Sequence, residues 1–376
     1  MKRSRTYYIA LGSNKGDKLQ NLQKAVEAMH FKIGTVKAIS KVYASPAFGF
    51  DGDDFLNACL VLNSDLEPEA VLHALLAIEV SLGRVRAEGV EGYQARTVDL
   101  DIIFSEEDII STDTLEVPHP EMSKRQFVLL PLHDIVPNMV HPILHKTVSE
   151  LLASCGDTSV LEPISQNLNS PRGRYNLSKY KYIAVEGNIG AGKTSLATKM
   201  ANDFSATLIL ERFADNPFLP KFYEDMQRYA FPLEMSFLAD RYQQIHEDLL
   251  QLDMFKDFII SDYDVFKSLI FSKVTLSEDE FNLYGKLFDL MHRNLIKPDL
   301  YVFLYQSTAR LQANIKARGR HYEQDIANDY LEKINAGYLE FLKNQADVEV
   351  KIIDITDRDF VKNREDYLWV LGEVFG

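Results

Sequence analysis

The sequence predicts two α/β domains joined by a linker, and three observations support this prediction. The chain has 376 residues, which is more than one hydrophobic core of ordinary size takes up. After residue 180, short buried strands alternate with long helices, as in a doubly wound parallel sheet. Residues 6–155 mix strands and helices without that order, and the stretch between the halves is rich in Ser, Asn, Pro and Gly. We therefore predict domains over 1–157 and 180–376, with a linker over 158–179.

Composition narrows the functional classes. Hydrophobic residues make up 46% of the chain and charged residues 26%, as in globular proteins. The net charge of −14 argues against nucleic acid or an anionic membrane as the main partner. No apolar run reaches the roughly 18 residues of a membrane span, and the run over 7–11 is too short for a signal sequence. Two cysteines, Cys59 and Cys155, suit a reducing compartment. We expect a cytoplasmic protein that acts on small molecules.

Periodicity places the main elements. In the first half it predicts helices over 18–29 and 68–82, an apolar run over 7–11, and strands over 41–43, 56–62 and 98–104. The second half is expected to form a parallel sheet of five strands, over 181–186, 207–211, 257–261, 300–304 and 350–355. Ligands of such sheets lie beyond the carboxyl ends of the strands, so the residues there are the first candidates for function.

A phosphate-binding loop follows the first strand of this parallel sheet. It matches the pattern G-x-x-x-x-G-K-[ST] at every fixed position, through Gly187-Asn188-Ile189-Gly190-Ala191-Gly192-Lys193-Thr194, and Ser195 continues into a helix. The glycines let backbone N–H groups close around a phosphate at the start of that helix. Lys193 can reach the β- and γ-phosphates, and the Thr194 hydroxyl can ligate Mg²⁺. The sequence therefore predicts a site for ATP.

Two aspartates alternate along the predicted strand over 98–104. Asp99 and Asp101 share one face, about 7 Å apart, and repel each other unless a cation bridges them. Mg²⁺ is commonly held by a few carboxylates together with substrate phosphates. The nearby groups that can bind phosphate are Arg84, Arg86, Arg96, His119 and Arg125. These residues alone leave open that the strand face is merely solvated.

Five short motifs follow one another in the first half. They are Ile9-Ala10-Leu11-Gly12-Ser13-Asn14, Phe55-Leu56-Asn57-Ala58, Leu82-Gly83-Arg84-Val85-Arg86, Arg96-Thr97-Val98-Asp99-Leu100-Asp101 and Val117-Pro118-His119-Pro120. Together they resemble hydroxymethyldihydropterin pyrophosphokinase, a folate-pathway enzyme, over residues 6–155. The resemblance implies a ferredoxin-like α+β fold. It also implies transfer of pyrophosphate from ATP to the hydroxymethyl group of the pterin, with AMP as the other product.

The same resemblance implies residue roles. Asp99 and Asp101 would ligate two Mg²⁺ ions. The triphosphate would be held by Arg84, Arg86, Arg96, His119 and Arg125, with Arg84 and Arg96 taking part in catalysis. The pterin would be bound by Phe55, Asn57 and Phe127. Glu79 is either the family's buried acid near the nucleotide or a residue of the helix surface. The rival hypothesis is a domain that binds pterin without transferring pyrophosphate.

Three features at strand ends indicate the chemistry of the second half. Glu211 ends the second strand, where it can take a proton from a hydroxyl nucleophile. Asp262 ends the third strand, the position that joins Thr194 on Mg²⁺. Arg318 and Arg320 follow the helix after the fourth strand and can fold over the triphosphate as a lid.

The second half resembles the deoxyribonucleoside kinases related to deoxycytidine and deoxyguanosine kinase. The motifs are the phosphate-binding loop, Leu210-Glu211, Asp215-Asn216-Pro217, Tyr229-Ala230-Phe231, Ala239-Asp240-Arg241-Tyr242 and Lys316-Ala317-Arg318-Gly319-Arg320-His321-Tyr322-Glu323. The resemblance covers residues 180–376. It implies that Glu211 is the general base on the 5′-hydroxyl of a deoxynucleoside and that Thr194 and Asp262 hold Mg²⁺. It implies binding of sugar, base and phosphate by Tyr223, Arg241, Glu323, Arg318 and Arg320. A homodimer through this half is also implied.

Three positions depart from the kinase family. Tyr263 follows Asp262 where an arginine is usual, and Asn314 stands where a lid arginine is common. Glu234 replaces the glutamine that reads the edge of the base. A carboxylate only accepts hydrogen bonds, and guanine presents two donors, its N1–H and its exocyclic amine. We therefore predict a preference for deoxyguanosine.

Two other functions remain open for the second half. A thymidylate-like nucleoside monophosphate kinase needs arginines for the acceptor phosphate, and Arg212 could supply one. A module that senses ATP without turnover would explain the missing arginines, although Lys193, Glu211 and Asp262 are intact. No shared intermediate connects a pterin with a deoxynucleoside, so we expect two independent activities on one chain.

Overall fold

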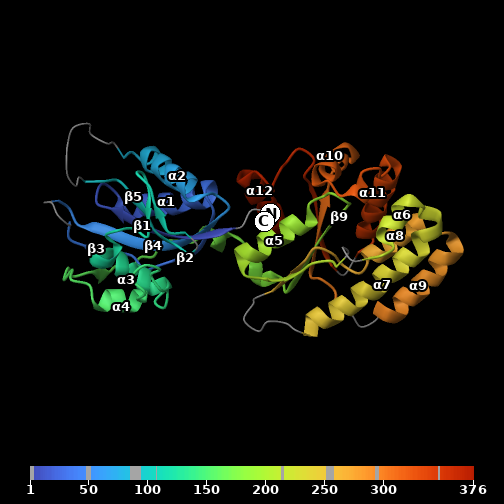
Figure 1. The fold of residues 1–376 in the computed structure, drawn as a ribbon, viewed down its shortest axis with the longest axis horizontal. Helices are drawn as coiled ribbons and strands as arrows, with labels where there is room; N and C mark the ends of the chain where they lie inside the picture. Colours follow the sequence, from blue (N-terminus) through green and yellow to red (C-terminus); the bar gives the residue numbers. More distant parts are fainter. Residues whose placement is uncertain are drawn as a thin grey trace. The chain divides into compact units, whose positions relative to one another are not determined.

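The computed structural model describes residues 4–47, 52–84, 95–106, 108–212, 216–250, 258–292, 296–345 and 348–376, without the side chains of 245, 248–250 and 292. The chain divides into two compact units, Met1–Arg174 and Tyr175–Gly376. Each unit has its own sheet and helices (Figure 1). Within these ranges, no helix has both the length and the apolar character that crossing a bilayer requires.

The first unit is built on an antiparallel sheet with two long helices. Its main elements are β1 (Arg5–Ser13), α1 (Lys18–Lys32), β2 (Thr35–Ile39), β4 (Phe55–Ser64), α2 (Pro68–Ser81) and β5 (Asp99–Ser105). The strands lie in the order β5-β1-β4, and β2 pairs with β4. The Asp17 carboxylate accepts a hydrogen bond from the backbone N–H of Gln20 at 3.0 Å, which explains the start of α1.

Side-chain alternation along the strands gives this sheet two apolar faces. Tyr7, Ile9 and Leu11 of β1 pack with α1 and α2, whereas Tyr8 faces a second cluster on the other side. That second cluster is covered by α3 (Gln126–Ile135) and α4 (Val148–Ala153). The smaller elements of the unit are β3 (Tyr43–Ser45), β6 (Ile110–Ser111), β7 (Glu116–Val117), β8 (Glu162–Pro163) and the 3-10 turns Met122–Lys124 and Pro171–Arg174.

Residues 158–174, which the sequence analysis includes in the linker, pack on the first unit. The strand β8 pairs with β3, and the Ile164 N–H donates to the Val42 carbonyl at 2.9 Å. Leu168 is 8% exposed within the same core as α1, and the Asn169 N–H donates to Gln23 at 2.8 Å. The polar composition suggested a linker here, but the side chains of Ile164 and Leu168 pack against the core of the first unit.

The second unit is built on a five-stranded parallel sheet, as the sequence predicts. The strands are β9 (Tyr182–Gly187), β10 (Thr207–Ile209), β11 (Ile259–Ser261), β12 (Leu300–Tyr305) and β13 (Glu349–Asp354). They lie in the order β10-β11-β9-β12-β13, with every pair parallel. All six residues of β9 are buried, which fits a parallel sheet covered on both faces. Thus β9, which leads into the phosphate-binding loop, is the central strand.

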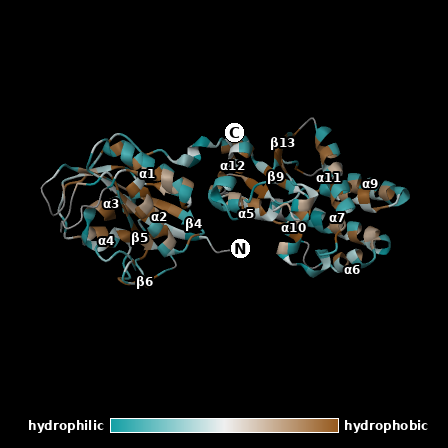
Figure 2. Ribbon diagram, turned by 90° about the horizontal axis from the view of Figure 1, so that it is seen from above, coloured by the Kyte–Doolittle hydropathy of each residue, from teal (hydrophilic) through white to brown (hydrophobic). Residues whose placement is uncertain are grey.

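The helices of this unit surround the sheet and extend beyond it. They are α5 (Lys193–Phe204), α6 (Leu219–Glu224), α7 (Met226–Leu250), α8 (Lys267–Thr275), α9 (Glu278–His292), α10 (Thr308–Arg318), α11 (Asn328–Lys343) and α12 (Arg364–Phe375), with 3-10 turns at Leu177–Lys179 and His321–Glu323. Helices α7, α8 and α9 pack against one another (Figure 1). Figure 2 shows the apolar residues gathered along strands such as β9, with hydrophilic residues on the outer helices.

Candidate active sites

The first candidate site lies at the start of β5, where it pairs with β1. Asp99 is opposite Gly12 and Asp101 is opposite Ala10. Leu100 between them is buried, whereas the two aspartates are partly exposed, so both carboxylates lie on the same face of the sheet. The sequence-predicted residues that line the pocket on this face are Phe55, Asn57, Arg96, Asp99, Asp101, Arg125 and Phe127.

Two arginines neutralise the first aspartate. The Arg84 Nη1 donates to Asp99 Oδ1 at 2.6 Å, and Arg96 pairs with the other carboxylate oxygen. Arg84 also pairs with Glu79, which is 2% exposed and accepts a hydrogen bond from the Leu100 N–H at 2.8 Å. Burial raises the pKa of Glu79 above its usual value. Of the two readings of Glu79, the structure therefore favours the buried acid.

The second aspartate has a different electrostatic environment. Burial, followed by the negative charge of Asp99, raises the pKa of Asp101 to about 7. A cation on this face would offset both effects by stabilising the ionised carboxylates, and their oxygen donors fit Mg²⁺. Among the described residues no cluster of three or more His, Cys, Asp or Glu could hold a metal. The cation would therefore depend on ligand phosphates to complete its coordination, together with this carboxylate pair.

The proposed pterin residues lie beside the aspartates. Asn57 is buried, and its Nδ2 donates to the Ser45 Oγ at 2.9 Å. A Cβ atom on Gly12 would lie 3.5 Å from Asn57 Oδ1 and 3.6 Å from the Phe55 ring, so this glycine is next to both proposed pterin residues. The Arg125 guanidinium lies 5.9 Å from the Phe127 ring centre.

His119 and Arg86 complete the predicted set for the first half. Burial, followed by the charge of Arg125, lowers the pKa of His119, and its Nδ1 accepts a hydrogen bond from the Glu121 N–H at 3.1 Å. Arg86 lies outside the described residues.

The second candidate site begins at the loop between β9 and α5. Gly190 and Gly192 have φ angles of +83° and +89°, which side chains other than glycine rarely adopt. The Lys193 Nζ donates to the carbonyls of Gly187 and Asn188 at 2.9 and 3.0 Å, so the ammonium lies over the loop. Burial, followed by the charge of Lys267, lowers the pKa of Lys193 to about 8.

The other loop residues have supporting positions. Asn188 is 1% exposed, and its Nδ2 donates to the Leu331 carbonyl at 2.7 Å and to Asn335 Oδ1 at 2.8 Å. Ala191 is also buried, and Ser195 lies in the first turn of α5. The predicted residues that line the pocket above the loop are Ile189, Gly190, Lys193, Thr194, Glu211, Tyr223, Glu234, Arg241, Asp262, Arg318, Arg320 and Glu323.

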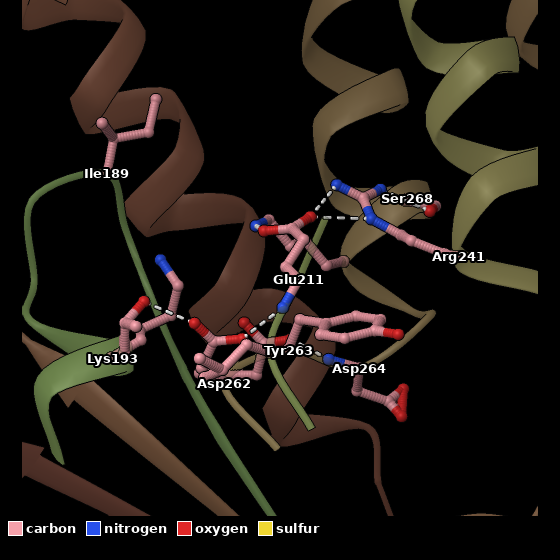
Figure 3. Close-up of polar contacts among 12 residues, drawn as sticks. Ile189, Lys193, Glu211, Arg241, Asp262, Tyr263, Asp264 and Ser268 are labelled. Atoms are coloured by element: carbon pink, nitrogen blue, oxygen red, sulfur yellow. Dashed lines mark hydrogen bonds and ion pairs between the residues drawn. The ribbon is translucent and has the colours of Figure 1, made fainter. Parts of the chain in front are cut away.

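The strand-end acids meet in front of the loop, as expected for neighbouring parallel strands. The Thr194 hydroxyl donates to Asp262 Oδ2, and the Glu211 N–H donates to Asp262 Oδ1 at 2.7 Å. Figure 3 shows Asp262 between Lys193 on one side and Glu211 on the other. A hydroxyl and a carboxylate in contact are the oxygen donors that Mg²⁺ takes in phosphoryl-transfer sites.

Two cations hold the Glu211 side chain. Arg241 donates to Glu211 Oε1 through Nε at 2.9 Å and Nη2 at 2.6 Å (Figure 3). Lys267 donates to Glu211 Oε2 at 2.6 Å. Burial alone would raise the pKa of Glu211, but Lys267 and Arg241 together lower it well below its usual range. Glu211 is therefore a carboxylate, with both oxygens occupied by cations.

Glu234 lies on α7 in the same pocket. It is 2% exposed, and its Oε1 accepts a hydrogen bond from the Thr275 hydroxyl at 3.2 Å. Its Oε2 is buried and has no hydrogen-bond partner within the described part of the chain. Burial raises the pKa of Glu234 to about 7, although the charge of Arg241 opposes the shift. A buried oxygen without a partner in a pocket indicates a donor on the ligand.

The lid residues are paired with the predicted sugar-binding acid. Arg318 pairs with Glu323 Oε2, and the Arg320 Nη1 donates to Glu323 Oε1 at 3.1 Å. Glu323 is 4% exposed. Tyr223 stacks on Tyr322 with ring centres 6.0 Å apart. The structure therefore brings the phosphate-side and sugar-side candidates together at one carboxylate.

The sequence analysis did not predict the contacts of two residues in this site, Asn314 and Lys267. The Asn314 Nδ2 donates to the Gly190 carbonyl at 3.0 Å, so this residue ties α10 to the phosphate-binding loop. Lys267 lines the pocket, but the sequence analysis does not single it out. Its partner Glu211 is 56 residues away in the chain, and only its place shortly after a strand-end acid could have marked it.

Comparisons with known proteins confirm the two family resemblances. The family model described as 7,8-dihydro-6-hydroxymethylpterin-pyrophosphokinase matches residues 8–137, and the model described as deoxynucleoside kinase matches 183–374. A 2-amino-4-hydroxy-6-hydroxymethyldihydropteridine pyrophosphokinase of Synechocystis sp. is 39% identical over 40% of this chain and 77% of its own length. A deoxyguanosine kinase of Bacillus subtilis is 36% identical over 51% of this chain and 95% of its own length.

This chain belongs to both families. It is a bifunctional enzyme with a 2-amino-4-hydroxy-6-hydroxymethyldihydropteridine diphosphokinase in its first unit and a deoxynucleoside kinase in its second. Among solved structures, a deoxyadenosine kinase from M. mycoides with bound dATP has a TM-score of 0.45 and 25% identity, covering 51% of this chain and 99% of that one. We call the two units the pyrophosphokinase unit and the kinase unit.

The family assignment decides between the alternatives for the kinase unit. A deoxynucleoside kinase differs from a nucleoside monophosphate kinase in its acceptor, which is a hydroxyl rather than a phosphate. Arg212, the arginine available for an acceptor phosphate, pairs with Glu247 at 3.4 Å and its side chain is 62% exposed. Because it points to solvent, it lends no support to the monophosphate alternative.

Proposed function

We propose that the pyrophosphokinase unit uses the face of β5 to transfer pyrophosphate from ATP to 6-hydroxymethyl-7,8-dihydropterin. Asp99 and Asp101 would hold Mg²⁺, which neutralises charge that develops on the phosphates. Asn57, Phe55 and Phe127 would orient the pterin so that its hydroxymethyl oxygen faces the carboxylates. The observation that supports this proposal is the carboxylate pair on the floor of an aromatic-walled pocket.

In the same unit, the basic groups would bind the triphosphate. Arg84 and Arg96, which now neutralise Asp99, would turn to the phosphates as the reaction proceeds, and Arg86, His119 and Arg125 would complete the set. Apart from the three-residue β3, the elements follow the order β-α-β-β-α-β along the chain, with β5-β1-β4-β2 in space, which supports a ferredoxin-like fold for this unit.

The test is a direct assay of the AMP-forming reaction. We expect AMP only when ATP, Mg²⁺ and hydroxymethyldihydropterin are all present. Asp101→Asn should lower the rate by about 100-fold or more, because one of two metal carboxylates becomes neutral. Asp113→Asn, an exposed aspartate of the same unit, is the matched control. AMP formation without Mg²⁺, or full activity of Asp101→Asn, would contradict the proposal.

In the kinase unit, Glu211 would take the proton of the nucleoside 5′-hydroxyl while that oxygen attacks the γ-phosphorus of ATP. The loop over Gly187–Ser195 would cradle the phosphates, Lys193 would contact the β- and γ-phosphates, and Thr194 and Asp262 would hold Mg²⁺. Sugar, base and lid contacts would come from Tyr223, Arg241, Glu323, Arg318 and Arg320. The convergence of Glu211, Asp262 and Thr194 before this loop supports these roles.

We further propose that deoxyguanosine is the preferred nucleoside. Glu234 has one oxygen held by Thr275 and one without a partner, so it offers acceptors to the N1–H and the amine of guanine. Adenine and cytosine would each need a donor at this position. The similarity to a deoxyguanosine kinase supports the same preference.

A panel of deoxynucleosides tests this preference. We expect deoxyguanosine to have the highest kcat/KM. Glu234→Gln should lower that value by about 10- to 100-fold while deoxyadenosine and deoxycytidine gain relative to it, because an amide both donates and accepts. Glu224→Gln, an exposed glutamate on α6, should leave the ranking unchanged. If deoxyguanosine is a poor substrate of the intact protein, the assignment of Glu234 is wrong.

The remaining expectations also belong to this proposal. We infer that the protein acts in the cytoplasm, that it uses Mg²⁺–ATP at both sites, and that the kinase unit pairs into a homodimer. The limits 1–157 and 180–376 for the two domains stay predictions.

A further inference from the structure

The side chain of Tyr263, the residue after Asp262, lies in the core and not in the active site. Tyr263, which stands where the family usually has an arginine, is 0% exposed and packs with Leu238, Tyr284 and Phe288. A tyrosine buried there brings no positive charge to the reacting phosphates. The kinase reaction still spreads negative charge over the transferred phosphoryl group, which a nearby cation stabilises.

Lys267 lies four residues further along the chain, and it does enter the site. It is the first residue of α8, and it lines the same pocket as Lys193, Thr194 and Asp262. Its side chain is 9% exposed, and its Nζ donates to Glu211 Oε2 at 2.6 Å. A second cation of this pocket, besides Lys193, therefore contacts the proposed base.

Arg241, the other cation that pairs with Glu211, makes more hydrogen bonds than Lys267 does. Arg241 donates two hydrogen bonds to Glu211 Oε1, donates a third to the Ser268 hydroxyl at 2.6 Å, and lies 4.6 Å from the Phe237 ring centre. These contacts fix the guanidinium in place. Among the described residues Lys267 makes one ion pair, with Glu211, and its Nζ lies 5.4 Å from the Phe271 ring centre. Its ammonium is carried on a flexible four-carbon stem and has fewer hydrogen bonds to break than the Arg241 guanidinium.

We propose that Lys267 is a catalytic residue of the kinase unit and supplies the positive charge that the absent arginine would bring. This inference rests on the proposed role of Glu211. The O–H bond of the 5′-hydroxyl breaks and its proton passes to Glu211, while the oxygen forms a bond to the γ-phosphorus. The bond from the γ-phosphorus to the bridging oxygen breaks, and its electron pair leaves with ADP.

The change in the charge of Glu211 during this step explains how Lys267 would reach the phosphoryl group. Before the reaction, Glu211 carries a negative charge that the two cations share. After the proton arrives Glu211 is neutral, and Arg241 alone satisfies its hydrogen bonds. Lys267 is then released toward the phosphoryl oxygens, where negative charge has appeared in the same step.

Steady-state kinetics of Lys267→Met in the full chain tests the proposal. We expect kcat for deoxynucleoside phosphorylation to fall by about 100-fold or more, with each KM changed by less than about threefold, because the lost charge acts on the transition state. Lys267→Arg should recover at least about a tenth of the activity, because it restores the charge. The AMP-forming activity of the same chain and its melting temperature report on folding.

Lys273→Met is the matched control, since Lys273 lies on the same helix and its side chain is 55% exposed in an ion pair with Glu340. It should leave kcat unchanged. Full activity of Lys267→Met would overturn the proposal, and so would a Lys267→Arg variant as slow as Lys267→Met, which would assign the loss to packing. Glu211→Gln is measured in parallel: if it alone is slow, only the lysine assignment fails, and if it too is fully active, the proposed base fails as well.

Discussion

At the scale of single residues, the pocket of the kinase unit contains a buried carboxyl oxygen that has no hydrogen-bond partner among the described residues. Glu234 is buried in the pocket with one oxygen unpaired, and its pKa is about 7. Burial of a carboxyl group favours its neutral form, so the raised pKa means that the folded state holds the proton more tightly than the unfolded chain does. At neutral pH this position therefore costs stability, which fits the proposed recognition of the base.

We predict that Glu234→Gln stabilises the protein at pH 8 and has little effect at pH 4.5. The stability that protonated Glu234 contributes is fully present below the unfolded pKa of 4.5 and is lost as pH rises through the folded value of about 7. Above pH 7 the neutral amide should gain about 3 kcal/mol at most. Chemical denaturation at the two pH values measures the difference.

The control for this prediction is Glu224→Gln, which removes an exposed charge from α6. It should shift the unfolding free energy by the same small amount at both pH values. An equal gain for Glu234→Gln at pH 4.5 and pH 8 would show that the effect is not one of protonation.

At the scale of elements, the phosphate-binding loop packs tightly against α10, the helix that leads to the lid arginines. Gly190 has φ +83°, and a Cβ atom there would lie 3.0 Å from Ile315 and 3.2 Å from the Leu311 carbonyl, both on α10. The Asn314 Nδ2 also donates to the Gly190 carbonyl. The loop therefore cannot change shape without moving the helix that leads to Arg318.

We predict that Gly190→Ala raises the KM for ATP at least about tenfold and destabilises the kinase unit by about 1–3 kcal/mol, because alanine is strained at this φ and crowds α10. The AMP-forming activity should remain, since the pyrophosphokinase unit has its own core. Gly285→Ala is the contrasting variant: it lies within α9 with nothing within 4 Å of its Cβ position. It should gain about 0.5–1 kcal/mol. Unchanged ATP kinetics in Gly190→Ala would contradict the coupling.

A second element-scale prediction concerns residues 158–174. Leu168→Ala should lower the unfolding free energy of the pyrophosphokinase unit by about 2–3 kcal/mol, because it removes a side chain that is 8% exposed in the core. Val160→Ala, whose side chain is 72% exposed in the same segment, should have almost no effect. Thermal melting followed through the AMP-forming activity distinguishes a packed segment from a linker.

Much of the fold could be predicted because the signals are local. The five parallel strands and the helix after Gly192 follow from short apolar runs and a glycine pattern. Helix α3 was missed because Pro131 lies inside it, and β2 was missed because its five residues show little alternation. In the sites, Asp99 could be named from its alternation with Asp101 along one strand, and Glu211 and Asp262 from strand ends. The pairing of Lys267 with Glu211 could not, because the two residues are 56 positions apart and only the tertiary fold brings them together.

At the scale of the whole molecule, two complete units each carry a site. The described residues of each pocket all come from one unit, Met1–Arg174 or Tyr175–Gly376. Neither unit borrows a side chain from the other for these pockets. The chain therefore has the means to run its two reactions separately.

We predict that Asp99→Ala abolishes AMP formation and leaves deoxynucleoside phosphorylation within about twofold, and that Glu211→Gln does the reverse. A loss of about 100-fold or more at the altered site is expected from the removal of a metal carboxylate or a base. Both activities are measured on the same preparation, so each is the folding control of the other. A parallel loss of both activities in either variant would show that the units depend on each other.

The proposed roles of Glu323 and the two lid arginines predict cooperativity between the two substrates of the kinase unit. One carboxylate holds both lid arginines and is also the proposed partner of the sugar 3′-hydroxyl. A nucleoside that hydrogen-bonds to Glu323 would weaken the ion pairs of this carboxylate with Arg318 and Arg320, so that the arginines can bind the triphosphate. By thermodynamic linkage, bound triphosphate would then favour nucleoside binding to the same extent. Calorimetric titration should therefore find deoxynucleoside bound more tightly once a non-hydrolysable ATP analogue is in place.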